Sequence, residues 1–268
     1  AGMDRRNSFL RPCRLAVQLE VLRVTYKCLS SYMYSNDATS ALILNASAFY
    51  PEGGGQEGDY GRVVQGSTSV QVLDTQVVRG VILHMCDGPL EVGQSVTGQL
   101  DWKRRKQLMD HHTAVHIVGG AARRILGPHV YQAGANKSVE SGRLDITHFN
   151  RLSRGDLDAI EALANSVLGD VSRTEKTELN RKDADEIHGF DLYQGGAPKG
   201  NSIRVLKIAE HDIQACGGTH HDEPGQIGSI RVVRSNAVQD GVERLHIVAG
   251  EAALEYARDQ DELLRASS

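Results

Sequence analysis

The sequence predicts an α+β protein in which a small antiparallel β-barrel is followed by an α+β domain, whose antiparallel sheet is packed by helices. Residues 12–100 consist of short alternating or apolar runs separated by turn residues, which is typical of barrel strands. From Asp101 onward, apolar residues recur every three to four positions, which indicates a helix. We therefore expect a barrel domain over residues 1–100, an α+β domain over 101–249 and a final helix over 250–268.

Two patterns predict the strands of the barrel. RLAVQLEVLRV (14–24) and SVQVLDTQVV (69–78) alternate apolar and polar residues, whereas ALIL (41–44) and GVILHM (80–85) are short apolar runs. Turn-forming residues separate these segments, and the longest such stretch contains the glycine cluster of residues 53–55.

A long helix is predicted to begin after Asp101, which is a suitable N-cap, and to end at Gly127-Pro128. Its apolar positions are Leu108, Val115, Val118, Ala122 and Ile125. His112 and His116 are one turn apart beside this stripe, so both imidazoles project from one helix face. Gly119 and Gly120 continue that face, and we expect another segment of backbone to approach closely there.

The remaining elements follow from the same reasoning. Ser153 and Asp156 form a capping-box pattern that opens a second amphipathic helix. Cys216 ends a strand and precedes a Gly217-Gly218 turn. The other predicted elements are strands at 143–149, 171–179, 203–208, 227–234 and 242–248, a short helix at 181–189, a loop at 192–200, and an amphipathic helix from Gly250. This last helix has no C-cap, so we expect it to continue beyond residue 268.

Composition narrows the function classes. The chain has 268 residues, 40% of them hydrophobic, and a formal charge of −4. It contains no apolar run of the roughly 18 residues that a membrane-spanning helix needs, so we expect no membrane partner. Its four cysteines, Cys13, Cys28, Cys86 and Cys216, are too few for a secreted disulfide framework, and we predict a reducing, cytoplasmic location.

Two half-sites carry ligands of the kinds that zinc prefers. His112 and His116 share one helix face, and Cys216 and His220 flank a diglycine turn about one hundred residues later. Thiolate and imidazole together favour Zn²⁺ over Mg²⁺ or Ca²⁺, which bind oxygen. Each half-site alone is more often a surface or core feature, but both together predict a shared zinc ion. Whether the two halves meet is left open by the sequence.

Two familiar zinc chemistries do not match the pattern. A zincin helix needs glutamate directly after its first histidine, whereas Thr113 occupies that position. A nucleobase deaminase needs a His-x-Glu element and a Pro-Cys-x-x-Cys element, and neither occurs in the sequence.

When the half-sites are combined with FYPEGGGQEGDYG (49–61), the chain resembles the editing region of alanyl-tRNA synthetases of the archaeal type, and the free-standing AlaX proteins related to them. ILGPHVYQAGA, RLDITHF, GFDLYQGG, ACGGTH and DGVERLHIVAGEAALEY strengthen this resemblance. It covers the chain from about residue 12 to its end. The three motifs in order make the resemblance specific, although none of them is specific alone.

The resemblance implies hydrolysis of tRNA(Ala) mischarged with serine or glycine. A pocket built for a methyl side chain cannot exclude glycine by size, and it cannot strongly reject an added hydroxyl, so a second hydrolytic site is needed. His112, His116, Cys216 and His220 would hold the zinc, which is expected to position the ester rather than to supply an open coordination site. Further implications are tRNA as the partner and oligomerisation through sequence beyond the C-terminal helix.

The resemblance also suggests residues that contact the substrate. Gln56, together with Gly54 and Gly55, is a candidate for recognition of the seryl group, although the glycines alone are explained by a turn that requires positive φ. Thr113 and Thr219 are candidates for the serine hydroxyl, and each is equally well explained as a local cap. Some family members carry threonine where this chain has Val115, so another group must take over any role of that threonine here.

Basic residues at both ends of the long helix are candidates for phosphate contacts with the acceptor stem of the tRNA. They are Lys103, Arg104, Arg105, Lys106, Arg123 and Arg124. A basic block of this kind is more commonly a solvated helix face.

Three hypotheses follow. The chain is an editing fragment of an alanyl-tRNA synthetase, a complete AlaX-like trans-editing protein, or a zinc-stabilised tRNA-binding module without activity. The uncapped final helix favours the first. The parent synthetases bind ATP and ligate alanine, but no signature for either activity is visible, so we do not expect this chain to charge tRNA.

Overall fold

The computed structural model describes residues 21–33, 39–171, 173–194, 196–198 and 200–267. The strand predicted over 14–24 therefore lies inside the described residues only from Val21 onward. The chain divides into two compact units. One unit contains the described residues up to Gly53 together with Glu57–Lys106, and the other contains Gly54–Gln56 together with the residues from Gln107 onward. None of the described helices is long and apolar enough to cross a membrane.

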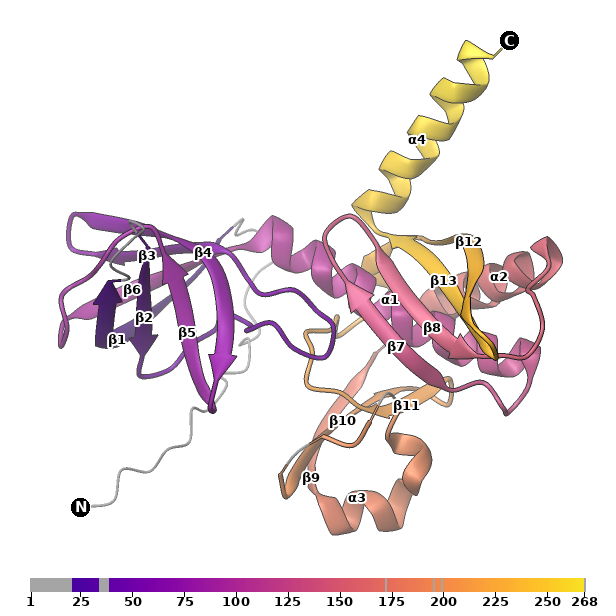
Figure 1. Cartoon of the computed structure of the whole chain (residues 1–268), viewed down its shortest axis with the longest axis horizontal. Helices are drawn as coiled ribbons and strands as arrows, with labels where there is room; N and C mark the ends of the chain where they lie inside the picture. The colour runs from indigo at the N-terminus through magenta and orange to yellow at the C-terminus, as the bar shows by residue number, and fades with distance from the viewer. Residues whose placement is uncertain (1–20, 34–38, 172, 195, 199, 268) are drawn as a thin grey trace. The chain divides into compact units, whose positions relative to one another are not determined.

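The first unit contains a closed antiparallel barrel (Figure 1). Its strands are β1 (Val21–Met33), β2 (Ser40–Leu44), β3 (Gly61–Gln65), β4 (Thr68–Val78), β5 (Val81–Cys86) and β6 (Ser95–Asp101). They are ordered β1-β2-β5-β4-β3-β6, and pairing of β6 with β1 closes the ring. Closure leaves no unpaired strand edge. The predicted small antiparallel barrel is thus confirmed, and β3 and β6 are strands that the sequence patterns did not single out.

Side-chain alternation fills the barrel. In β6, Val96, Gly98 and Leu100 are buried in turn between more exposed neighbours. Gly98 lies against the rings of Tyr26 and Phe49, where an added methyl group would come within 2.8 Å of Tyr26. The absence of a side chain at this position therefore lets two aromatic rings occupy the interior.

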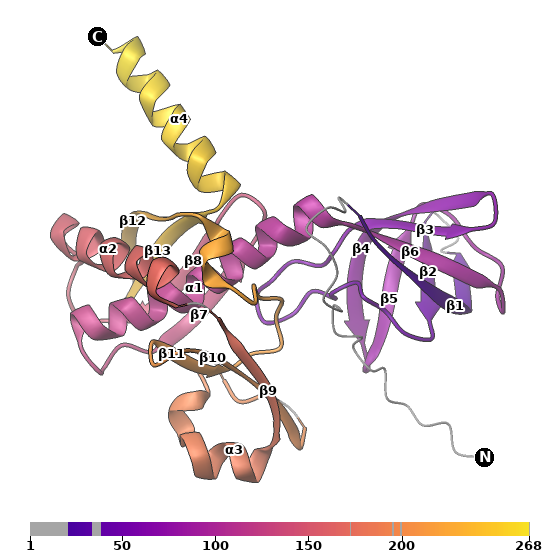
Figure 2. The ribbon, with the colours of Figure 1, turned by 180° about the vertical axis from the view of Figure 1, so that it is seen from behind.

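The second unit is built on a four-stranded antiparallel sheet of order β12-β13-β8-β7. Its strands are β7 (Gln132–Lys137), β8 (Gly142–Thr147), β12 (Ile230–Gln239) and β13 (Val242–Ala249). Helices α1 (Trp102–Leu126) and α2 (Arg154–Asp170) pack their apolar residues against one face of this sheet (Figure 2). This arrangement confirms the predicted α+β class.

A smaller sheet of order β11-β10-β9 joins the same unit. It consists of β9 (Glu175–Asn180), β10 (Ser202–Ile208) and β11 (Asp212–Ala215), with α3 (Arg181–His188) and the 3₁₀ turn η1 (Phe190–Leu192) beside it. Ala184, Leu192, Ile203 and Val205 form its own core. A second 3₁₀ turn, η2 (Pro224–Ile227), precedes β12, and α4 (Glu251–Ala266) follows β13.

The predicted helix boundaries agree with the structure. The backbone N–H of Arg104 donates to Asp101 Oδ1 at 3.0 Å, which makes Asp101 the cap of α1, and Gly127 follows its last residue with φ of 121°. Ser153 and Asp156 form both hydrogen bonds of a capping box on α2.

Two details of the α1 prediction require correction. Ile125 is 41% exposed and does not belong to the buried stripe. Gly120, as predicted, lies against backbone, because a Cβ there would come within 2.7 Å of the His211 carbonyl oxygen. Gly119 instead meets only the side chain of Leu144, at an ordinary contact distance of 3.6 Å.

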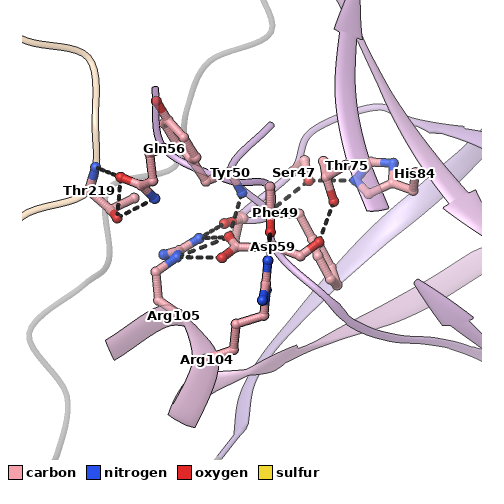
Figure 3. A network of polar contacts seen from close by, with 12 residues as sticks. Ser47, Phe49, Tyr50, Gln56, Asp59, Thr75, His84, Arg104, Arg105 and Thr219 are labelled. Carbon is pink, nitrogen blue, oxygen red and sulfur yellow. Dashed lines mark hydrogen bonds and ion pairs between the residues drawn. The ribbon is translucent and has the colours of Figure 1, made fainter. Parts of the chain in front are cut away.

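The basic block at the start of α1 is divided between different environments. Lys103 is exposed, but Arg105 is buried and pairs with Asp59, whose carboxylate also accepts from the Tyr50 backbone N–H (Figure 3). Arg105 also donates to the Ala48 carbonyl oxygen at 2.7 Å. From the sequence, we expect all four basic residues at the start of α1 to be available for phosphate. Arg105 is not, because its guanidinium is already bound to Asp59 and Ala48 inside the barrel unit.

Arg104 is half-buried, and its guanidinium bonds Glu57 and the Gly58 carbonyl while stacking 3.7 Å above the centre of the Tyr60 ring. Its charge is thus also largely matched within the unit.

Replacing Arg105 with methionine should destabilise the barrel unit by about 3–5 kcal/mol, because it leaves the buried Asp59 carboxylate without its cation. The single tryptophan, Trp102, lies in this unit, so urea unfolding followed by its fluorescence reports the change. The control Lys103→Met, at an exposed position, should shift stability by no more than about 0.5 kcal/mol. Equal stability of the two variants would show that the Asp59 pair contributes nothing.

Candidate functional site

Four potential metal ligands converge in the second unit. His112 and His116 come from α1, Cys216 directly follows β11, and His220 ends the turn after it. One ligand atom from each residue lies within 4.8 Å of those of the other three. Cys216 Sγ is 3.4 Å from His112 Nε2 and 3.2 Å from His220 Nε2. The structure thus brings together the two half-sites that the sequence leaves about one hundred residues apart.

The diglycine of the Cys216–His220 turn explains how the rings come so close. A Cβ on Gly218 would overlap the imidazole of His112, whereas one on Gly217 would meet no atom within 4 Å. The centroids of the His112 and His220 rings are 4.3 Å apart. Gly218 is therefore required by contact with α1, while Gly217 is free of that constraint.

Each histidine makes a further hydrogen bond through its other ring nitrogen. His112 Nδ1 lies 2.6 Å from Gln56 Oε1, and His116 Nδ1 lies 2.8 Å from Asp212 Oδ2. Both partners accept hydrogen bonds, so both Nδ1 atoms carry a proton and both Nε2 atoms face the other ligands of the group. Outer partners of this kind fix the tautomer and orientation of metal-binding histidines.

The third ring is held less tightly. His220 Nδ1 is 3.4 Å from the hydroxyl oxygen of Thr113, which also accepts from the His221 backbone N–H at 3.3 Å. Thr113 is completely buried, so its hydroxyl serves the turn after β11 and is turned away from solvent.

Gln56 is completely buried and joins two parts of the site. Its Oε1 accepts from His112. The same oxygen accepts from the backbone N–H of Thr219 at 3.1 Å, and Nε2 donates to the Thr219 hydroxyl at 2.8 Å (Figure 3). The side chain therefore orients His112 and Thr219. Thr219 is only half-buried, which distinguishes it from Thr113.

Glycine is needed at positions 54 and 55, before Gln56, for reasons that differ between the two positions. Gly54 and Gly55 have φ of 57° and 74°, which side chains rarely adopt. A Cβ on Gly55 would also overlap the Ala135 carbonyl oxygen, whereas one on Gly54 would meet open space. Lys137 holds this turn through its backbone N–H to the Gly55 carbonyl and its Nζ to the Gly54 carbonyl, each at 2.6 Å.

Burial and mutual charge set the protonation of the four residues. Burial lowers the pKa of His112 and of His220 well below the usual value, so both imidazoles are neutral. Burial also acts to lower the pKa of His116, but Cys216 and Asp212 outweigh it and raise that pKa to about 9. For Cys216, burial acts to raise the pKa, and His116 together with the Gly218 N–H lowers it overall.

This donor set fits a metal ion. The group offers two neutral imidazoles with inward lone pairs, and a cysteine whose thiolate form is favoured. Metal binding requires these forms of both ligands, and the proton on His116 would have to leave. Imidazole nitrogen and thiolate sulfur are both common zinc donors, and four of them match the tetrahedral coordination that zinc prefers.

A cavity of about 520 Å³ lies beside α1 in the same unit. Its wall includes Val115, Arg123, Tyr131, Gln132, Asp191 and Asp212. The four candidate ligands are absent from the lining among the residues that the structure describes, and Asp212, which holds His116, is the link between cavity and ligand group. The volume falls within the range of small-molecule sites.

The two arginines near the end of α1 contact this region. Arg123 donates to Asp191 at 3.1 Å and lies 4.5 Å from the centre of the Tyr131 ring. Arg124 is exposed, but it donates to the carbonyl oxygens of Gly120 and His211. Both guanidiniums are thus partly engaged by the protein itself.

Sequence reasoning missed several residues that support the ligand group. Asp212 could have been suspected, because residues 212 and 216 lie on one side of a strand and carboxylates commonly hold metal-binding histidines. Lys137 gave no signal, although it is buried and its burial lowers its pKa to about 8. Arg204 and Lys176, which bond the Gly218 and His220 carbonyls, could not be found because their contacts depend on strand pairing.

Comparisons with known proteins agree with this arrangement. Residues 203–246 match the family described as "Threonyl and Alanyl tRNA synthetase second additional domain", and residues 3–104 match "tRNA synthetases class II (A)". The first of these matches spans Cys216 and His220.

The chain is also similar to curated proteins named alanine–tRNA ligase. It is 45% identical to that of Halorubrum lacusprofundi over 83% of this chain and 24% of the relative. Identity is 46% with Natronomonas pharaonis, over 98% and 29%, and 43% with Saccharolobus islandicus, over 84% and 26%. The chain thus spans about a quarter of the length of these relatives.

The glycine turn provides a matched pair of substitutions. Gly54→Ala should cost about 1–2 kcal/mol for its left-handed backbone. Gly55→Ala should cost more, because the added methyl also meets the Ala135 backbone, which cannot move aside cheaply. Thermal unfolding followed by circular dichroism measures the difference. Equal melting temperatures for the two variants would mean that close approach to β7 is not what fixes this turn.

Proposed function

The chain belongs to the alanyl-tRNA synthetase family, and on that premise we propose that it hydrolyses serine and glycine from tRNA(Ala) charged with the wrong amino acid. The observation that carries the proposal is the group of His112, His116, Cys216 and His220, held from outside by Gln56 and Asp212. The proposed setting is the cytoplasm, where a reducing environment keeps the sulfur of Cys216 from being oxidised to a disulfide.

The ligand group is proposed to hold Zn²⁺, because its nitrogen and sulfur donors suit that ion. When bound, the ion would supply fixed positive charge next to the ester, with four protein ligands closing its coordination shell. Asp212 and Gln56 orient His116 and His112, and Thr113 orients His220. The protein thereby fixes the position of the charge before any substrate arrives.

The substrate is proposed to enter the cavity beside α1. Tyr131 offers a ring for the terminal base and Arg123 offers positive charge for the phosphate that follows it. Asp212 lies on the same wall, so an ester bound there would be next to the ligand group. Hydrolysis then requires an ordered water, with help from the neighbouring ribose hydroxyl of the substrate.

Selectivity against alanine is proposed to come from Thr219. Its hydroxyl is oriented by Gln56, and its side chain is half-buried, whereas Thr113 is completely buried. A polar group that pairs with the serine hydroxyl is left unpaired by alanine, which is the stronger direction of discrimination. Val115 lines the cavity, but its side chain has no hydroxyl to offer the serine.

Zinc affinity should depend on the outer carboxylate. Asp212→Asn should weaken zinc binding about 10- to 100-fold, because His116 loses its charged partner. Asp191→Asn, which alters a carboxylate of the same cavity that bonds Arg123 and Tyr131, should leave it unchanged. Zinc retention against a competing chelator measures both. Retention of zinc by Cys216→Ala would remove the basis of the metal assignment.

The decisive experiment compares the release of serine and alanine from the same tRNA(Ala). The zinc-loaded chain should release serine and spare alanine, whereas Cys216→Ala should release neither amino acid. Thr219→Val should slow serine release more than glycine release, because only serine has a hydroxyl to pair. Binding of tRNA without release of serine, with zinc in place, would instead identify an inert RNA-binding module.

A further inference from the structure

The four-stranded sheet of the second unit has one face that α1 and α2 do not cover (Figure 1). Val232, Leu144, Ile146, Leu245 and Ile247 turn inward to the core that these helices share. Because side chains alternate along a strand, the residues between them lie on the opposite face. In β12 a register shift between Val232 and Arg234 moves Arg234 to that face as well, since it pairs with His246. The composition of that face is therefore set by the strand register.

Register places basic side chains next to one another on three strands. Arg234 of β12 pairs with His246 of β13, and His246 pairs in turn with Arg143 of β8. Beside this row, Arg244 of β13 is opposite Asp145 of β8. We call these five residues the basic sheet face.

The contacts within the basic sheet face leave an excess of positive charge. Arg244 donates two hydrogen bonds to Asp145, at 2.7 and 2.9 Å, so those two charges are matched. Arg143 lies 3.8 Å from the same carboxylate and is 38% exposed, and Arg234 is exposed. The five residues therefore carry three guanidiniums and one carboxylate, which gives a local charge of +2 on a chain whose formal charge is −4.

The central histidine is consistent with this cluster. Burial lowers the pKa of His246, and Arg234 and Arg244 lower it further, so the imidazole is neutral at pH 7. It lies 2.9 Å from Asn236 Oδ1, which fixes the ring. The positive charge therefore comes from arginines that stay charged at any physiological pH.

We propose that the basic sheet face binds the phosphate backbone of an RNA. Arg143 of β8 and Arg234 of β12 flank His246 of β13, so their backbones are two strand spacings, roughly 10 Å, apart. Two long guanidinium side chains at this spacing can contact phosphates of one RNA strand, and such contacts supply affinity and register without reading sequence. The basic block at the start of α1 is a weaker candidate for the body of the RNA, because Arg105 is buried against Asp59 and Arg104 pairs with Glu57.

The inference rests on the proposed function, since that function makes a tRNA the substrate. It places the RNA body on the open side of the sheet and leaves the cavity beside α1 for the terminal nucleoside. Positive charge around Arg143 and Arg234 would then serve binding of the whole tRNA and not the hydrolysis of the ester itself.

The test uses the full chain, an uncharged tRNA(Ala) transcript and fluorescence anisotropy at several KCl concentrations. Arg143→Gln combined with Arg234→Gln should weaken binding at least tenfold near 0.1 M salt. The slope of log K against log salt should fall by about 2, because each phosphate contact contributes about 0.9. Lysine at both positions should restore most of the affinity and the slope. Arg244 stays unchanged in all variants, so that Asp145 keeps its partner.

Arg154→Gln is the matched control. This arginine is 60% exposed on α2, the helix that covers the other face of the sheet. It should leave the affinity and the salt slope unaltered, and circular dichroism should show all variants folded. An equal loss in the control, or wild-type binding by the double variant, would overturn the proposal. Preferential loss of binding to poly-glutamate would identify an acidic protein as the partner and overturn it as well.

A short ester separates this inference from the proposed function. The double variant should hydrolyse seryl-adenosine as the wild type does, while losing activity on low concentrations of seryl-tRNA(Ala). If neither the wild type nor the double variant hydrolyses either ester, the editing proposal is rejected. The anisotropy measurement alone then decides whether the basic sheet face binds RNA. A loss on seryl-adenosine equal to that on seryl-tRNA would instead place Arg143 and Arg234 in the hydrolytic site, against the inference.

Discussion

The second unit depends on the packing of one turn against one helix, which places the thiol of Cys216 among the imidazoles of His112, His116 and His220. Three buried imidazoles beside a thiol are costly to assemble without a cation, because burial disfavours charge and neutral rings cannot satisfy one another. Hydrogen bonds to the outer ring nitrogen, Nδ1, of each histidine reduce this cost and fix the orientation of all three rings. Gln56, Asp212 and Thr113 do so from three separate segments of the chain. The site is thus a property of the assembled unit and not of either motif.

The contacts of Gln56 explain why the turn before it is rich in glycine. A turn that carries Gln56 must reach His112 and Thr219 at once, and it does so by lying against β7 with no side chain at Gly55. Lys137 holds the turn with both its backbone and its ammonium group, although burial of that ammonium is itself unfavourable. Charge from the Cys216 thiolate favours the protonated lysine, so the turn and the ligand group support each other electrostatically.

Local rules predicted most of the fold, and long-range contacts account for what they missed. Alternation, caps and glycine stops predicted the barrel, α1 and the capping box of α2, because each depends on residues close in sequence. Spacing also selected the four residues that converge. It could not show that Arg105 turns inward to Asp59, that Thr113 is buried or that Asp212 holds His116, because those contacts join segments 46 to 107 residues apart.

Strand register also determines where positive charge gathers on the surface, which the sequence alone does not show. A basic block such as Lys103–Lys106 is conspicuous in the sequence, yet two of its guanidiniums are matched by carboxylates of the same unit. Arg143, Arg234 and Arg244 are scattered over about one hundred positions, and pairing of three strands gathers them around a single imidazole. Because phosphate binding depends on net local charge, the scattered set is the better-placed one. A surface of this kind becomes visible only when each arginine is counted together with the carboxylate that it faces.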